Sequence, residues 1–149
     1  MTLYFAYGSN MSRTWMKRLC PKAQALGPAQ LMHYRFLVMS AGYASVLPQA
    51  GDVVHGVLWR IAPGDFDALD RYEDVAGGLY HRCTMPVQYG GDQHTALVYV
   101  GRSRAPGRAR SEYCEVVLRA ARDWELPAHY IARLVRQLSA REGEAGEVA

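Results

Sequence analysis

The sequence has few cysteines and no long apolar run. Its three cysteines, Cys20, Cys83 and Cys114, lie far apart and form no CxxC pair, which argues against a disulfide framework or a thiolate zinc site and favours a reducing compartment. The five histidines are equally scattered, with no HExxH or HxxxH spacing, so we expect no metal. No apolar run approaches the length of a membrane span, and the N-terminus has no basic signal-like segment. We therefore expect a cytoplasmic protein with no membrane partner.

A strong excess of charge of one sign is also missing. Lys and Arg number 17 and Asp and Glu 14, which leaves a net charge of +3 over 149 residues. This excess is too small to indicate nucleic-acid binding by itself, so we expect no nucleic-acid partner. Four arginines do gather in the loop Gly101–Arg110. Such a loop is either a solvated surface or a site for an acidic partner.

The composition is that of a globular protein, and the length is that of one domain. Six runs bounded by Gly, Pro or Asp predict strands: Leu3–Tyr7, Leu31–Met39, Ala44–Leu47, Val53–Ile61, Tyr80–Tyr89 and Gln93–Val100. Four segments predict helices: the stripe Met11, Trp15 and Leu19; a helix beginning with Asp65 as N-cap; Ser111–Trp124; and Pro127–Leu138.

This order of elements is neither a regular βα alternation nor all-β. It predicts an α+β fold, in which a curved mixed β-sheet or small barrel of about six strands is flanked by about four helices. We expect a single domain over residues 1–140. The small acidic tail at residues 141–149 is expected to be frayed.

Glu73 is the first residue that could carry chemistry. Phe66, Leu69 and Glu73 are spaced i, i+3, i+7, so on a helix they share one face. A carboxylate that points toward a core with two apolar residues is desolvated, which raises its pKa toward the range of a working base. The alternative is that the helix has already ended, so that Glu73 lies on a solvated turn beside Asp74.

The turn Gly8-Ser9-Asn10 is the second candidate, because it follows a strand and opens a helix. Free backbone N–H groups at the start of a helix can hold an anion such as a carboxylate or phosphate. The alternative is a purely local role, with Asn10 or Ser12 as the N-cap.

Tyrosine is unusually frequent, with ten tyrosines against three phenylalanines. A buried tyrosine hydroxyl needs a partner, so a tyrosine-rich interior often lines a polar pocket. Tyr80 follows a Gly-Gly break, Tyr99 lies late in a predicted strand, and Tyr113 lies near the start of a predicted helix. Each one taken alone is equally compatible with the edge of a core.

Four segments, taken in order, resemble the γ-glutamylcyclotransferase family, which includes the AIG2-like proteins. Tyr4–Met11 is similar to the YGSN opening of the family, and Gly51–Trp59 is similar to its G-D-x-V-x-G-x-x-W segment. Leu69–Glu73 with Gly78–Tyr80 is similar to its L-D-x-x-E…G-x-Y segment. The C-terminal pattern of the family is matched by Tyr113 with Leu126-Pro127 and Tyr130. The resemblance runs from about Leu3 to Leu138, nearly the whole chain.

The resemblance implies a reaction without metal or cofactor. In this family the α-amine of a γ-glutamyl amide attacks its own γ-carbonyl and releases 5-oxoproline and an amino acid or amine. The resemblance makes Glu73 the general acid and base, and the turn Tyr7–Asn10 (Tyr7, Gly8, Ser9 and Asn10) the holder of the substrate α-carboxylate and glutamyl backbone. Tyr80, Tyr99 and Tyr113 fall where family members have pocket tyrosines.

Several points remain open at this stage. Asp74 stands where many relatives have glycine, and a second acid there either raises the pKa of Glu73 further or reshapes the turn. The leaving group is an amino acid, an amine or part of a biosynthetic intermediate. A non-catalytic relative that binds a small ligand is a separate alternative. The assembly is a monomer or a homodimer.

Overall fold

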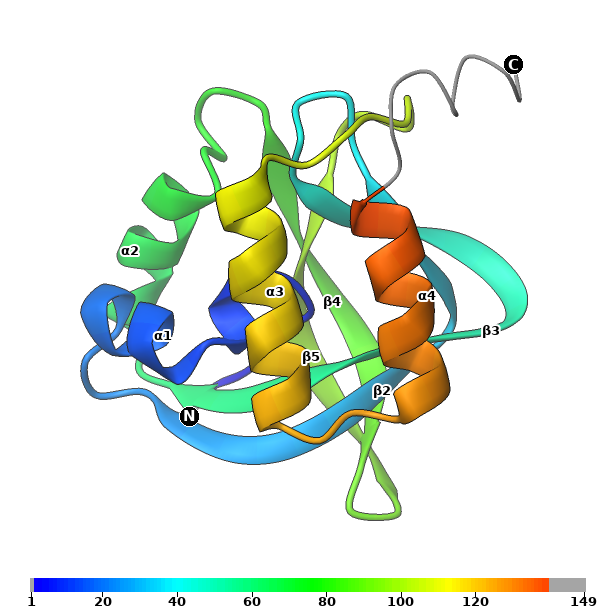
Figure 1. Cartoon of the computed structure of the whole chain (residues 1–149). Helices are drawn as coiled ribbons and strands as arrows, with labels where there is room; N and C mark the ends of the chain where they lie inside the picture. The colour runs from blue at the N-terminus through cyan, green and yellow to red at the C-terminus, as the bar shows by residue number, and fades with distance from the viewer. Residues whose placement is uncertain (1, 140–149) are drawn as a thin grey trace.

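The computed structural model describes residues 2–139. Its five strands form a closed barrel in the order β1-β3-β2-β4-β5 (Figure 1). The strands are β1 (Thr2–Ala6), β2 (Gln24–Val38), β3 (Ala44–Ile61), β4 (Tyr80–Tyr89) and β5 (Asp92–Gly101). The helices are the 3-10 turn η1 (Ser9–Met11), α1 (Arg13–Leu19), α2 (Asp65–Tyr72), α3 (Ser111–Asp123) and α4 (Ala128–Leu138).

The sheet is mixed. The strand β1 pairs antiparallel with β3 and parallel with β5, where Tyr4 is opposite Leu97, and the remaining pairs are antiparallel. The predicted single α+β domain with a small mixed barrel and four flanking helices is therefore confirmed. The expected frayed tail lies outside the described residues.

The number of strands was predicted one too high. Ala44–Leu47 and Val53–Ile61 belong to one strand, β3, which pairs with β2 along its length. Pro48 and Gly51 look like a turn in the sequence, but Pro48 pairs with Tyr34, and Gly51 lies beyond it at a shift in the register of this ladder between Met32 and Tyr34. The backbone of both strands absorbs the irregularity with positive φ angles of 66° at His33 and 80° at Gly51, so the pairing continues.

Two helix starts also differ from the expectation. The segment from Met11 divides into η1 and α1, and Ser12 between them caps α1 by accepting a hydrogen bond from Trp15 N at 3.2 Å. Asp65 is the first residue of α2 and not its N-cap, because its carboxylate folds back to accept from Ala62 N at 2.9 Å.

The helices cover one side of the barrel and position the site. Figure 1 shows α3 and α4 side by side, with α1 and α2 beyond α3. Both α1 and α3 contact η1, and α4 contacts β2. The core between these layers is apolar and almost fully buried, with Phe5, Met11, Met16, Leu58 and Leu69 each 0% exposed. Within residues 2–139, no helix is long and apolar enough to span a membrane.

Candidate active site

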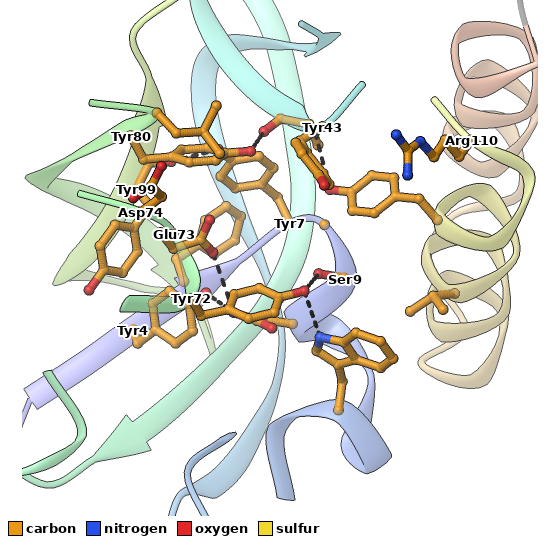
Figure 2. Close-up of a pocket in the computed structure, with 18 of the residues that line it drawn as sticks. Tyr4, Tyr7, Ser9, Tyr43, Tyr72, Glu73, Asp74, Tyr80, Tyr99 and Arg110 are labelled. Atoms are coloured by element: carbon orange, nitrogen blue, oxygen red, sulfur yellow. Dashed lines mark hydrogen bonds between the residues drawn. The ribbon is translucent and has the colours of Figure 1, made fainter. Parts of the chain in front are cut away.

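A cavity of about 760 Å³ lies where β1, η1, the end of α2 and the start of α3 meet. Seven tyrosines line it, together with a small set of charged and polar side chains (Figure 2). The lining residues are Tyr4, Phe5, Tyr7, Gly8, Ser9, Asn10, Trp15, Tyr43, Ala44, Tyr72, Glu73, Asp74, Leu79, Tyr80, Tyr99, Arg110, Glu112, Tyr113 and Val116. Every residue singled out by the sequence as a candidate for catalysis or substrate binding is among them.

Glu73 lies immediately after the last residue of α2. Although the helix ends at Tyr72, the Glu73 N–H still donates to the Leu69 carbonyl at 2.9 Å, as a helical residue would. This bond keeps the Glu73 side chain on the face of the buried Leu69, so that it points into the cavity. The helix does end before Glu73, as the alternative interpretation held, and Glu73 lies on the turn that follows, but its side chain is partly buried there.

The surroundings of Glu73 favour its neutral form. Figure 2 shows its carboxyl group among the rings of Tyr4, Tyr7, Tyr80 and Tyr99. Burial raises the pKa of Glu73 to about 8. Within residues 2–139 the salt bridges join Arg82 to Asp70 and Arg133 to Asp52, and neither involves Glu73. Its carboxyl group is therefore desolvated without a cation to hold it ionised.

Asp74 occupies an unusual backbone position but does not act on Glu73 through charge. Its φ is 51°, in the left-handed region that glycine adopts most readily and that Asp tolerates. Its carboxylate accepts from Gly77 N at 3.1 Å, and its carbonyl accepts from Leu79 N at 3.1 Å. Asp74 therefore shapes the turn, whereas the raised pKa of Glu73 comes from burial.

The turn at residues 8–10 opens directly onto Glu73. The Asn10 side-chain amide donates to the Tyr4 hydroxyl at 2.9 Å and approaches Glu73 Oε1 at 3.5 Å. Since Ser12 is the cap of α1, Asn10 does not have that local role. Asn10 Oδ1 is buried without a hydrogen-bond partner in the described part of the chain. The first bond of η1 comes from Met11 N, which donates to the Gly8 carbonyl at 3.1 Å.

The hydroxyls of the three predicted pocket tyrosines, and of Tyr7 from the predicted substrate-holding turn, are used differently. The Tyr7 hydroxyl donates to the Tyr99 carbonyl, and the Tyr80 hydroxyl donates to the Ala44 carbonyl. The Tyr99 hydroxyl donates to Asp70 Oδ1. These three contribute ring surface to the cavity but have already used their hydroxyl hydrogens. The Tyr113 hydroxyl accepts from Ala44 N at 3.1 Å, so its own hydrogen remains available to a ligand.

Sequence reasoning missed part of the wall. The Tyr72 hydroxyl lies 2.8 Å from Ser9 Oγ and accepts from Trp15 Nε1 at 2.6 Å, which joins the end of α2 to η1 and α1. Tyr4 and Tyr43 also line the cavity. Tyr4 and Tyr72 stand inside motif segments and had a sequence signal. Tyr43 and Arg110 had none that linked them to Glu73.

The described residues contain no group of three or more His, Cys, Asp or Glu side chains that could hold a metal ion. What the arrangement offers is proton chemistry. A carboxyl group with a pKa near neutrality faces a cavity with a hydroxyl donor and a polar turn, the usual components for moving a proton to or from a bound small molecule.

Comparison with known proteins identifies the family. The family model described as "Gamma-glutamyl cyclotransferase, AIG2-like" matches residues 4–126. The chain belongs to this family. This confirms the resemblance noted in the sequence, and the match includes the turn at residues 8–10 and Glu73.

Individual relatives agree with the family match. Over 143 residues the chain is 25% identical to the human protein named gamma-glutamylcyclotransferase and 28% identical to the mouse protein of that name, in each case over 89% of this chain and 76% of the relative. A solved structure named "Gamma-glutamyl cyclotransferase" superposes with a TM-score of 0.84 and 25% identity, over 89% of this chain and 85% of the other.

Proposed function

We propose that this protein is a γ-glutamylcyclotransferase that uses Glu73 as its general acid and base. The α-amine nitrogen of a γ-glutamyl compound forms a bond to its own γ-carbonyl carbon, and the bond from that carbon to the leaving nitrogen breaks. The products are 5-oxoproline and an amino acid or amine. The observation that carries this proposal is the carboxyl group of Glu73, which is partly buried, forms no salt bridge within residues 2–139 and has its pKa raised to about 8.

The raised pKa suits the proton transfers that the reaction needs. At neutral pH the α-amine of the substrate is mostly protonated, with a pKa near 8 for an ordinary α-amino group. A base of similar pKa takes that proton at little cost in free energy, whereas an ordinary carboxylate is too weak. Glu73 takes a proton from the ammonium group so that the free amine can attack, and it delivers this proton to the leaving nitrogen. It then takes the second proton that the new ring nitrogen must lose and releases it to the departing amine or to solvent, so it ends the cycle as it began.

The rest of the cavity would position the reacting atoms. The volume of about 760 Å³ is in the range of small-molecule sites. The turn of Gly8, Ser9 and Asn10 would hold the α-carboxylate and glutamyl backbone, and the Tyr113 hydroxyl would donate to the γ-carbonyl oxygen as negative charge develops there. Holding the amine about 3–3.5 Å from the carbonyl carbon replaces a freely rotating chain, an advantage of several kcal/mol.

The test is release of 5-oxoproline by the purified protein from a panel of γ-glutamyl dipeptides and γ-glutamylamines. E73Q keeps the shape of the side chain and removes its acid–base function, so we expect turnover to fall about 10²–10⁴-fold. The matched control is E115Q, which neutralises an exposed carboxylate on α3 outside the cavity. Circular dichroism verifies that both variants are folded.

Each outcome has a definite meaning. Release by the wild type and by E115Q, together with loss in folded E73Q, supports the proposal. Release that persists in E73Q would show that another group is the base. Absence of release from every member of the panel would contradict the enzymatic function, and ligand binding measured by calorimetry would then favour a non-catalytic relative.

A further inference from the structure

The cavity has a buried end and an exposed end. Near Glu73, the side chains of Tyr4, Tyr80 and Tyr99 are 3%, 5% and 2% exposed. At the exposed end Tyr43 and Tyr72 are 42% and 38% exposed, and the ring of Tyr43 meets that of Tyr113 edge to face with centroids 5.5 Å apart. A γ-glutamyl compound with its α-amine at Glu73 therefore extends its leaving group toward Tyr43 and the start of α3.

Arg110 stands at this exposed end. It occupies the cap position before α3, with its carbonyl accepting from Cys114 N at 3.0 Å, so the start of the helix fixes its backbone. It lies three residues before Tyr113, a spacing that brings two side chains to the same side of a helix start. Figure 2 shows the guanidinium of Arg110 directed toward Tyr43 rather than away from the cavity.

The charge of Arg110 is available to a ligand. Of the charged side chains that line the cavity, Glu73, Asp74 and Glu112 are acidic, and Arg110 is the single cation among the described lining residues. The salt bridges of residues 2–139 do not include Arg110. The other arginines of the loop, Arg102, Arg104 and Arg108, do not line the cavity.

A guanidinium at this position distinguishes the two classes of leaving group. An amino acid that leaves from a γ-glutamyl peptide carries a carboxylate, which arginine binds through two parallel hydrogen bonds. An amine leaving group has no such charge. An exposed arginine gives a modest interaction because solvent screens its charge. For the same reason the carboxylate keeps part of its hydration when it binds there, so the free-energy cost of desolvating it is small.

Building on the proposed cyclisation, we propose that Arg110 is a specificity-determining residue that binds the carboxylate of the leaving group. The protein then acts on γ-glutamyl amino acids or peptides in preference to γ-glutamylamines. Arg110 takes no part in proton transfer. Its contribution is to binding of the departing half of the substrate.

The experiment compares γ-glutamyl-alanine with γ-glutamyl-alaninamide, which has the same scissile bond but no carboxylate on the leaving group. For the wild type we expect a higher kcat/KM with the acid. In R110Q this value should fall about tenfold for the acid and stay within about twofold for the amide. R110K should be intermediate, since it keeps the charge without the planar fork. R108Q is the matched control and should change neither value.

A second measurement makes the result independent of turnover. Calorimetric titration of E73Q, with and without R110Q, gives the affinity for both compounds in a protein that does not cyclise them. Preference for the acid that R110Q removes would support the role of Arg110 even where cyclisation itself is not observed. The proposed function fails by a different result, the absence of 5-oxoproline from every substrate.

Two results would overturn the inference. Equal losses on the acid and the amide would show that Arg110 binds the glutamyl half, which both compounds share, or supports the fold. No loss on either compound, by kinetics or by titration, would show that the guanidinium does not contact the substrate.

Discussion

A methyl group on Gly8 would lie 2.8 Å from the hydroxyl oxygen of Tyr113. Gly8 has a φ of −119°, outside the left-handed region, and the nearby Tyr113 hydroxyl leaves no space for a side chain at this position. The same hydroxyl accepts a hydrogen bond from Ala44 N, and Ala44 Cβ would be 3.5 Å from the added methyl. The absence of a side chain at Gly8 therefore leaves the space that the Tyr113 hydroxyl occupies in the cavity.

The first prediction follows from this contact. G8A should push the Tyr113 hydroxyl away from Ala44 N, lower the free energy of unfolding by about 1–2 kcal/mol and reduce kcat. In a Y113F background the added methyl meets no oxygen, so G8A should cost about 1 kcal/mol less there. Urea unfolding of the four proteins of this double-mutant cycle measures the coupling. Equal costs of G8A in both backgrounds would contradict the steric explanation.

The second prediction concerns the pH dependence of turnover. The proposed base is the ionised form of Glu73, whose pKa is raised to about 8 by burial. Below that pH the ionised fraction falls, so kcat/KM should decrease about tenfold per unit of pH and level off only near pH 8. A carboxylate of ordinary pKa would already give a plateau at about pH 5–6. Initial rates of 5-oxoproline release between pH 5 and 9 separate these two profiles.

The third prediction separates the two possible effects of Asp74. D74N removes the charge but keeps a side-chain oxygen for Gly77 N and a residue type that tolerates the positive φ. Because burial is the cause of the raised pKa of Glu73, the midpoint of the pH–rate profile should move by less than about 0.3 units. A shift of one unit toward lower pH would show that the charge of Asp74 does act on Glu73.

Local patterns predicted much of the fold. Tyr80–Tyr89 was predicted with the limits that β4 has. The helix predicted over Pro127–Leu138 ends at Leu138 as expected but begins one residue later, at Ala128, with Pro127 as its cap. In both cases the pattern of apolar residues and the flanking turn residues agree. The continuity of β3 was not predictable in this way, because the pairing of β2 across the irregular stretch near Gly51 is a contact between distant segments.

The same distinction applies to the candidate site. The direction of the Glu73 side chain was predicted, because it depends on neighbours within two turns of its own helix. The position of Arg110 at the cavity, on which its proposed role rests, was not predicted, since it depends on which of the loop arginines faces a cavity formed by other elements. Nor did the sequence indicate which tyrosine hydroxyl keeps its hydrogen, because the acceptors that use the others are main-chain carbonyls and Asp70.

The fourth prediction concerns stability, and its sign follows from the raised pKa of Glu73. The folded protein holds the Glu73 proton up to about pH 8, whereas the unfolded chain releases it near pH 4.3. Between these values the folded state binds more protons, so Glu73 makes the folded protein progressively less stable as pH rises through this window. The glutamine of E73Q does not titrate in this range, so it does not contribute to the change in stability.

E73Q should therefore gain stability over the wild type as pH increases from 5 to 8, and the difference should then stay constant. The change across the window should amount to a few kcal/mol, since each unit of pKa difference corresponds to about 1.4 kcal/mol. Urea unfolding at several pH values measures it, with E115Q as the exposed control whose difference from the wild type should not vary in this window. Parallel curves for E73Q and the wild type would mean that Glu73 is ionised in the folded protein, and the carboxyl group would then be too weak a base for the proposed transfer.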